Sequence, residues 1–196
     1  MHIILASRSP RRIELLTQIQ VSCTVMPADI DESVRLGELA EAYVQRLALE
    51  KAQAVRDSQT GADSDRLILA ADTTVALNGE ILGKPEDDTD AVRMLNKLSG
   101  TTHQVHTAIA ICGYNCIMHA INTTQVTMKM LSETIIQDYV KSGEHRDKAG
   151  SYGIQGLAGA WIQRIDGSYS GVMGLPLYET AQLLSEMKEH NWHKKS

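Results

Sequence analysis

Leu67-Ile-Leu-Ala-Ala-Asp-Thr-Thr-Val-Ala-Leu-Asn-Gly-Glu-Ile-Leu-Gly-Lys-Pro85 is the stretch of this chain that best predicts its fold. It opens with five apolar residues, 67–71, which indicate a buried strand. Asn78-Gly79 lies between two short apolar segments and predicts a two-residue hairpin turn. Asp72 directly follows the buried strand, where a carboxylate loses water and needs a cation, a metal or hydrogen bonds in compensation. Because open α/β sheets bind ligands at such strand ends, Asp72 is the first candidate site residue, with capping of a turn as the alternative.

The composition predicts one domain over residues 1–196, or two small lobes that share a sheet. The chain is 43% hydrophobic, which is enough for a core, and its net charge of −5 disfavours binding to nucleic acids or anionic membranes. Any anion site must then be a local cluster of lysine and arginine. The 3 cysteines are an odd number, the chain starts without a signal-peptide pattern, and no apolar run approaches the ~18 residues of a membrane span. We therefore expect a cytoplasmic protein.

The N-terminal segment predicts a strand, a turn and the start of a helix. Ile3 to Ala6 is apolar, Ser9 is a good helix N-cap, and Pro10 suits the first helical position. Free backbone N–H groups at a helix start form an anion site. Arg11 and Arg12 occupy this first turn, although the helix dipole disfavours cations there by ~0.3–1 kcal/mol each. Two such placements indicate a bound anion, with a solvated first turn as the alternative.

Three further charged residues stand out by their place in the pattern. Lys51 continues the apolar row of a helix predicted at 36–56, so its ammonium group either reaches solvent or points into a site. Glu32 lies in an acidic loop that is either simply solvated or helps to hold a divalent cation. Lys84 follows the predicted hairpin. Lys51, Lys84 and the two arginines would then surround the Asp72 carboxylate with positive charge. Such a site is typical of one that binds a nucleoside triphosphate with Mg²⁺ or Mn²⁺.

Glycine, histidine and cysteine residues give weaker signals. The polar segment 147–156 is rich in glycine, which lets backbone approach a ligand, but no dinucleotide-binding or P-loop pattern occurs, so a structural role is equally open. His103 and His106 lie three apart on a predicted strand, hence on opposite faces, and are a poor metal pair. Cys112 and Cys116 flank a turn and are expected to be small core residues rather than metal ligands.

The other patterns predict alternating strands and helices. Strands are expected at 21–26, 102–112, 117–128, 160–165 and 169–172, and helices at 36–56, 87–98, 132–143 and from Pro176 onward. The last two strands are expected to form a hairpin across Asp166-Gly167. A polar link at 57–65 and a basic, frayed tail at 190–196 complete the chain. The fold class expected from this order is α/β.

Four short motifs stand out when the chain is considered as a whole: Ala6-Ser-Arg-Ser-Pro-Arg-Arg12, Ala71-Asp-Thr73, Lys84-Pro85 and Asp147-Lys-Ala-Gly-Ser-Tyr-Gly-Ile-Gln-Gly156. In their order they resemble the Maf family of nucleoside triphosphate pyrophosphatases, over nearly the whole chain. The resemblance implies an elongated mixed β-sheet flanked by helices, with a cleft between two lobes. It also implies hydrolysis of a nucleoside triphosphate to the monophosphate and pyrophosphate, aided by Mg²⁺ or Mn²⁺. Ser-Pro-Arg-Arg12 with Tyr152-Gly-Ile-Gln-Gly156 resembles the branch that acts on dTTP and UTP.

The resemblance further implies roles for individual residues. Asp72 matches the proton acceptor that activates water, and Asp72 and Glu32 match metal ligands. Base choice is implied for three residues: Arg11, Thr73 and Gln155. Phosphate binding is implied for four residues: Ser7, Arg12, Lys51 and Lys84. A glutamine amide can pair with uracil or thymine, but a flipped amide also suits cytosine, so Gln155 alone does not exclude CTP.

Two other functions are compatible with the same pattern. The family has been linked to septum formation, so one alternative is a regulator of cell division. The cleft of such a protein would bind a nucleotide without hydrolysing it. A phosphatase would release orthophosphate instead of pyrophosphate. A carboxylate ringed by cations favours an enzyme. The resemblance implies a nucleoside triphosphate as the partner and a homodimer as the assembly; neither nucleic acid nor a membrane is expected as a partner.

Overall fold

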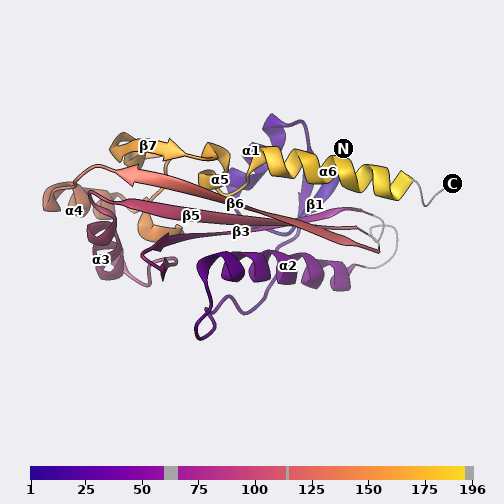
Figure 1. Ribbon diagram of the computed structural model, residues 1–196, viewed down its shortest axis with the longest axis horizontal. Helices are drawn as coiled ribbons and strands as arrows, with labels where there is room; N and C mark the ends of the chain where they lie inside the picture. Colours follow the sequence, from indigo (N-terminus) through magenta and orange to yellow (C-terminus); the bar gives the residue numbers. More distant parts are fainter. Residues whose placement is uncertain (60–65, 114, 193–196) are drawn as a thin grey trace.

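A seven-stranded mixed sheet forms the centre of the molecule in the computed structural model, which describes residues 1–59, 66–113 and 115–192 (Figure 1). The strands are β1 (His2–Leu5), β2 (Ser22–Val25), β3 (Ile68–Leu77), β4 (Glu80–Leu82), β5 (Thr102–Cys112), β6 (Ile117–Met128) and β7 (Ile162–Asp166). Their order is β2-β1-β3-β5-β6-β7, and β4 pairs with β3. β1 is parallel to β2 and β3, whereas all other pairs are antiparallel. The predicted α/β class with an elongated mixed sheet is confirmed.

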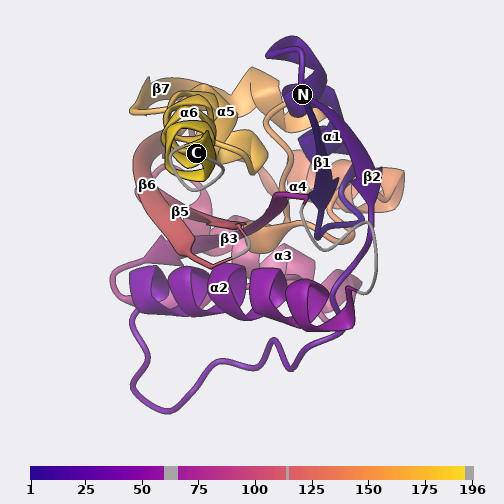
Figure 2. The same ribbon diagram turned by 90° about the vertical axis from the view of Figure 1, so that its right-hand side faces the viewer.

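Helices cover both faces of this sheet. They are α1 (Pro10–Gln18), α2 (Ala40–Ser58), α3 (Asp88–Leu98), α4 (Glu133–Ser142), α5 (Tyr169–Met173) and α6 (Leu177–Trp192), with the short 3₁₀ helices η2 (Ala149–Ser151) and η3 (Leu157–Trp161). Figure 2 shows α2 on one side of β3, β5 and β6, and α5 and α6 on the other. We call these two sides the α2 face and the loop face, because the 147–156 segment lies on the second.

Residues of β3 alternate between two separate cores. Ile68 and Ala70 pack with α2, and Leu69 and Ala71 pack in the larger core of the loop face. The core of the α2 face is rich in alanine, which lets the helix lie close to the sheet. Consecutive side chains of β3 therefore point to opposite faces of the sheet.

One edge of β3 is open at its middle. β1 pairs with β3 only at Ile68 and Leu69, and β4 pairs only from Val75 to Leu77. β5 occupies the other edge from Ile68 to Ala76. Within the described residues, the segment 70–74 therefore has a strand on one side only. The gap between β1 and β4 leaves room for a ligand beside the middle of β3.

Most of the predicted elements are confirmed. β5 and β6 have the expected bounds, and β3 and β4 form the predicted hairpin with positive φ at Asn78 (52°) and Gly79 (83°). The prediction that Asp72 ends a strand was wrong, because β3 continues through it to Leu77. β-branched residues follow Asp72, and pairing with β5 extends the strand.

Two other predictions were wrong. The helix predicted at 36–56 begins only at Ala40, and Leu36 and Leu39 are exposed, so the apolar residues before it do not belong to its buried row. The segment predicted as a strand at 169–172 is helix α5. Ser168 caps this helix by accepting a hydrogen bond from Gly171 N, and this cap outcompetes a hairpin.

The remaining expectations concern cysteines, membranes and the ends of the described segments. Cys112 is buried, Cys116 is half-buried, and both are free thiols. Within the described residues, no helix combines the length and apolar character needed to cross a membrane. Much of the link predicted at 57–65 and the end of the tail predicted at 190–196 lie outside the described residues.

Candidate active site

A cavity of about 920 Å³ opens beside the unpaired segment of β3. It is lined by β3, the β1–α1 turn, the acidic loop, α2, the turn after β4, and the 147–156 segment. All nine sequence-predicted site residues line it: Ser7, Arg11, Arg12, Glu32, Lys51, Asp72, Thr73, Lys84 and Gln155. The structure thus brings residues from six segments of the chain into one cleft.

On the α2 face, Lys51 bridges two carboxylates. Its Nζ lies 2.6 Å from Asp72 Oδ1 and 2.8 Å from Glu32 Oε1. Lys51 and Asp72 are each only 8% exposed. Lys51 therefore points into the cleft rather than to solvent, and it supplies the cation that a buried Asp72 requires.

Burial and charge act in opposite directions on these carboxylates. Burial raises the pKa of Asp72, and the nearby charges of Lys51 and Arg12 oppose this rise. Partial burial also disfavours ionised Glu32, but its hydrogen bond to Lys51 and the charge of that lysine hold its pKa below the ordinary value. A buried carboxylate of raised basicity beside cations is a common arrangement for a group that accepts a proton from water.

The same two carboxylates fit a divalent cation. Asp72 and Glu32 each place one oxygen within 2.8 Å of Lys51 Nζ, so the two carboxylates lie close together with the lysine ammonium between them. Mg²⁺ in nucleotide enzymes is commonly held by one or two carboxylates together with phosphate oxygens and water. In the described part of the chain, no group of three or more histidine, cysteine, aspartate or glutamate side chains could hold a metal. Two carboxylates can therefore hold a metal only where phosphate oxygens or water supply the other ligands.

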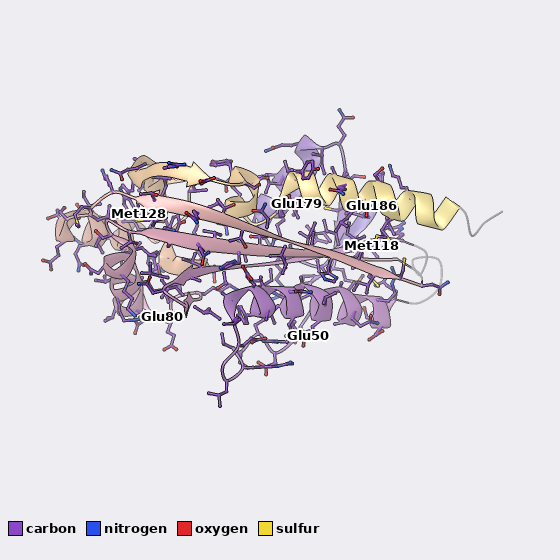
Figure 3. All side chains as sticks on the ribbon, in the orientation of Figure 1. Glu50, Glu80, Met118, Met128, Glu179 and Glu186 are labelled. Atoms are coloured by element: carbon purple, nitrogen blue, oxygen red, sulfur yellow. The ribbon has the colours of Figure 1, made fainter. Side chains whose placement is uncertain are left out.

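The loop at 27–39, which carries Glu32, is fastened to α2 by Arg46. The Arg46 guanidinium donates to both carboxylate oxygens of Glu38, at 2.6 and 2.8 Å, and to the Ser33 carbonyl at 3.0 Å. These bonds lower the pKa of Glu38 to about 2. Glu50 accepts from the same guanidinium at 3.2 Å and lies on the side of α2 away from the sheet (Figure 3). The loop is thus ordered by charge-assisted hydrogen bonds rather than by an apolar core.

A second contact fixes the backbone at Glu32 itself. The Tyr43 hydroxyl donates to the Glu32 carbonyl oxygen at 2.9 Å. The sequence analysis assigned neither Tyr43 nor Arg46 to the site. The available signal was the hydroxyl, because a tyrosine in a buried row needs a hydrogen-bond partner.

On the loop face, Arg12 organises three oxygen atoms. It donates from Nε to the Gly174 carbonyl (2.8 Å), from Nη1 to Ser7 Oγ (2.9 Å) and from Nη2 to Thr73 Oγ1 (3.3 Å). Gly174 ends α5 with φ of 109°, a conformation that favours glycine. This geometry directs the Gly174 carbonyl toward the cleft and holds the guanidinium beside Thr73.

The predicted anion site at the start of α1 differs in detail from expectation. Ser9 occupies the N-cap position, but its side chain makes no capping hydrogen bond. Pro10 has no N–H group, and the Arg12 N–H donates to the Ser9 carbonyl. The donors that this helix start offers to an anion are therefore side chains more than a row of free N–H groups.

The glycine-rich segment 147–156 packs closely on the loop face of β3. Gly150 has φ of 67°, and a Cβ atom there would lie 2.8 Å from a methyl group of Val75. Its N–H donates to the Gly83 carbonyl at 3.0 Å. A side chain at Gly150 would therefore push this segment away from the sheet.

Two buried rings hold the end of the same segment. The Tyr152 hydroxyl lies 2.8 Å from His103 Nε2, and the Tyr139 hydroxyl accepts from the Gly153 N–H at 3.2 Å. Burial lowers the pKa of His103 to about 4, so the ring is neutral at pH 7. The contact with Tyr152 gives His103 a structural role in anchoring this segment. Gln155 follows these anchors and is exposed in the cleft.

The remaining cations lie at the mouth of the cleft. Lys84 Nζ is 3.7 Å from Glu32 Oε2, and its side chain is 61% exposed. Burial lowers the pKa of Lys148, and the nearby charge of Arg11 lowers it further. The side chains of Arg11 and Gln155 make no hydrogen bond to another described residue and line the cleft, so both are available to a ligand.

Comparison with known proteins gives one consistent result. A family model described as "Maf-like protein" matches residues 2–187. A protein of Methylobacillus flagellatus named dTTP/UTP pyrophosphatase is 58% identical over 182 residues, which is 93% of this chain and 90% of the relative. Proteins with the same name from Pseudoalteromonas atlantica and Chromobacterium violaceum are each 52% identical over 185 residues, covering 94% of this chain and 96% and 93% of the relatives.

Proposed function

The chain belongs to the Maf family, and on this premise we propose that it is a hydrolase that converts dTTP and UTP to the monophosphate and pyrophosphate. The observation that carries the proposal is the Lys51–Asp72 contact inside a cleft lined with cations. A buried carboxylate that a lysine keeps in place is suited to accept a proton from an attacking water molecule.

Hydrolysis begins with the attack of water on one of the two phosphorus atoms that flank the α–β bridging oxygen. Asp72 takes the proton of this water, and Lys51 stabilises the carboxylate in its ionised form before the transfer. The bond from the bridging oxygen to the attacked phosphorus breaks, which releases the monophosphate and pyrophosphate. Phosphoryl transfer depends mainly on positioning and charge neutralisation, and the cleft supplies both.

Ser7, Arg12 and Lys84 bind the triphosphate in this proposal. Their donors come from separate segments that line the same cleft. A divalent cation, held by Glu32 and Asp72 together with phosphate oxygens, would neutralise further negative charge when bound. Arg46 and Tyr43 contribute indirectly, because they fix the loop that presents Glu32.

Base recognition is assigned to the loop face. Thr73 follows Asp72 on β3 and therefore points to the opposite face, where the segment containing Gln155 packs. If Asp72 lies beside the phosphates, Thr73 contacts a different part of the same nucleotide. Arg11 lines the same side of the cleft, near Lys148.

Product analysis tests the proposal directly. The protein is incubated with UTP, dTTP, CTP, ATP, GTP and 7-methyl-GTP in the presence of Mg²⁺ or Mn²⁺, and nucleotides and phosphates are separated. We expect equimolar pyrophosphate and monophosphate from UTP and dTTP. Orthophosphate with a nucleoside diphosphate would instead identify a phosphatase. Tight binding without any product would identify a nucleotide-binding regulator, and either outcome would overturn the proposal.

Replacement of Gln155 by alanine tests its role in base recognition. We expect kcat/KM for UTP and dTTP to fall by about 10- to 100-fold, because the loss of a paired amide in a binding site costs about 1–3 kcal/mol. The unfolding midpoint is expected to stay close to that of the wild type, since the side chain is exposed. Steady-state kinetics on UTP, dTTP and GTP provide the measurement.

Gln163, an exposed glutamine of β7 outside the cleft, provides the matched control. Gln163→Ala should leave all rates unchanged. An equal loss on every nucleotide in Gln155→Ala would contradict a role in base choice and indicate damage to the shared triphosphate site.

A further inference from the structure

Thr107 carries a fully buried hydroxyl group that the mechanism above does not use. It lies on β5 directly opposite Thr73, and it is 0% exposed. Its Oγ1 is 2.9 Å from Thr73 Oγ1 and 2.8 Å from the Gly171 carbonyl oxygen. The side chain does not line the cleft. In the sequence, Thr107 is a polar residue between the apolar residues Val105 and Ile109 on one face of β5.

The direction of this hydrogen-bond chain follows from the chemistry of its last member. A carbonyl oxygen can only accept, so the Thr107 hydroxyl must donate its single proton to Gly171. Thr107 Oγ1 can then only accept from Thr73, and the Thr73 hydroxyl must donate to it. If Thr107 donated to Thr73 instead, its oxygen would face the Gly171 carbonyl oxygen at 2.8 Å with no proton between them.

This order leaves Thr73 as a pure acceptor toward the cleft. Its proton is committed to Thr107, and one lone pair receives the Arg12 Nη2–H at 3.3 Å. One lone pair remains. Ser7 is in the opposite state, because its Oγ receives N–H groups from Ser9 (3.2 Å) and Arg12 (2.9 Å) and keeps its own proton free. Ser7 can thus donate to a phosphate oxygen, whereas Thr73 requires a donor on the ligand.

We propose that Thr107 is a positioning residue that fixes Thr73 as an acceptor and thereby selects pyrimidines with an N3–H group against cytosine. The inference rests on the proposed function. Uracil and thymine both carry a proton on N3, whereas N3 of cytosine carries a lone pair and would face the lone pair of Thr73. The 2′-hydroxyl is a weaker candidate for this contact, because UTP has it and dTTP lacks it. The Gln155 amide can pair with uracil or with cytosine, depending on its orientation. If Thr73 excludes cytosine, the orientation of this amide does not have to be fixed by another residue.

The test compares Thr107→Val with Thr107→Ser. Valine has nearly the shape of threonine and cannot accept from Thr73, so the Thr73 proton becomes available to N3 of cytosine. We expect the ratio of kcat/KM for UTP to that for CTP to fall by about 5- to 100-fold, the usual effect of leaving one buried polar group without its partner. Thr107→Ser retains the hydroxyl and should keep the wild-type ratio. Both substrates are measured on one preparation, so a smaller folded fraction does not change the ratio.

Binding of UMP and CMP by calorimetry provides a second readout that does not need turnover. The preference for UMP should fall in Thr107→Val and persist in Thr107→Ser. An unchanged preference in Thr107→Val, or an equal loss in Thr107→Ser, would overturn the inference. If Thr107→Val does not fold, Thr73→Val replaces it, because valine there removes the acceptor itself and must reduce the same ratio. A wild-type protein that prefers UMP but releases no pyrophosphate would refute the proposed function and leave this inference intact.

Discussion

Asp72→Asn is expected to lower kcat for UTP by about 10²–10⁴-fold, the range that a general base contributes. The amide has almost the shape of the carboxylate, so it still offers an oxygen to Lys51 Nζ at the place where Asp72 Oδ1 lies 2.6 Å away. It cannot take a proton from water at neutral pH. Rapid-quench measurement of pyrophosphate formation at saturating UTP gives kcat for the chemical step.

Binding and stability separate this effect from a general loss of structure. The Kd of a non-hydrolysable UTP analogue, measured without a divalent cation, should change little, because the lysine and arginine side chains of the triphosphate site remain. Lys51 keeps Glu32 as a counter-charge at 2.8 Å, so the fold should persist. Asp138→Asn, which neutralises an exposed aspartate of α4, is the matched control and should not affect turnover. Undiminished turnover in Asp72→Asn, or a loss matched by weaker binding, would refute the assignment of Asp72 as the base.

The sequence predicts those parts of the molecule in which local pattern and tertiary structure agree. β5 and β6 are long segments rich in β-branched residues, and pairing with each other along their lengths reinforces this preference. The β3–β4 turn follows from Asn78-Gly79, because that dipeptide accepts the positive φ values the turn requires. The apolar row containing Lys51 left two outcomes open, solvent or a site, and the structure places its ammonium group between two carboxylates.

Features that depend on distant partners could not be predicted in this way. Asp166-Gly167 is a typical hairpin dipeptide, but the next residues form α5 because the Ser168 hydroxyl caps it. This helix supplies Gly171, whose carbonyl orients the Thr107 hydroxyl from 64 positions away in sequence. The direction of the Thr73 hydrogen bond thus depends on helix α5, which the sequence predicted to be a strand. The Arg46 contacts to the Glu32 loop were missed for a similar reason, since no local pattern identifies an exposed loop held by hydrogen bonds.

Lys51→Met is expected to destabilise the fold by about 3–5 kcal/mol, the usual cost of removing one partner of a buried ion pair. The change leaves Asp72, which is 8% exposed, facing Glu32 with no cation between them. For a chain of this size, such a loss lowers the melting temperature by about 6–20 °C. Lys141→Met removes an exposed lysine that pairs with Asp138 on α4, and it should cost well under 1 kcal/mol. Thermal and denaturant unfolding of both variants provide the comparison.

The double variant Lys51→Met/Asp72→Asn decides whether charge, rather than packing, causes that loss. The asparagine removes the repulsion with Glu32, so the double variant should regain more than half of the stability lost in Lys51→Met. If it is as unstable as the single variant, the lysine acts mainly through the packing of its aliphatic stem. Recovery of stability in the double variant would show that the carboxylate and the lysine stabilise each other in the fold. The burial of Asp72 would then be a cost that the fold tolerates for catalysis and that Lys51 offsets.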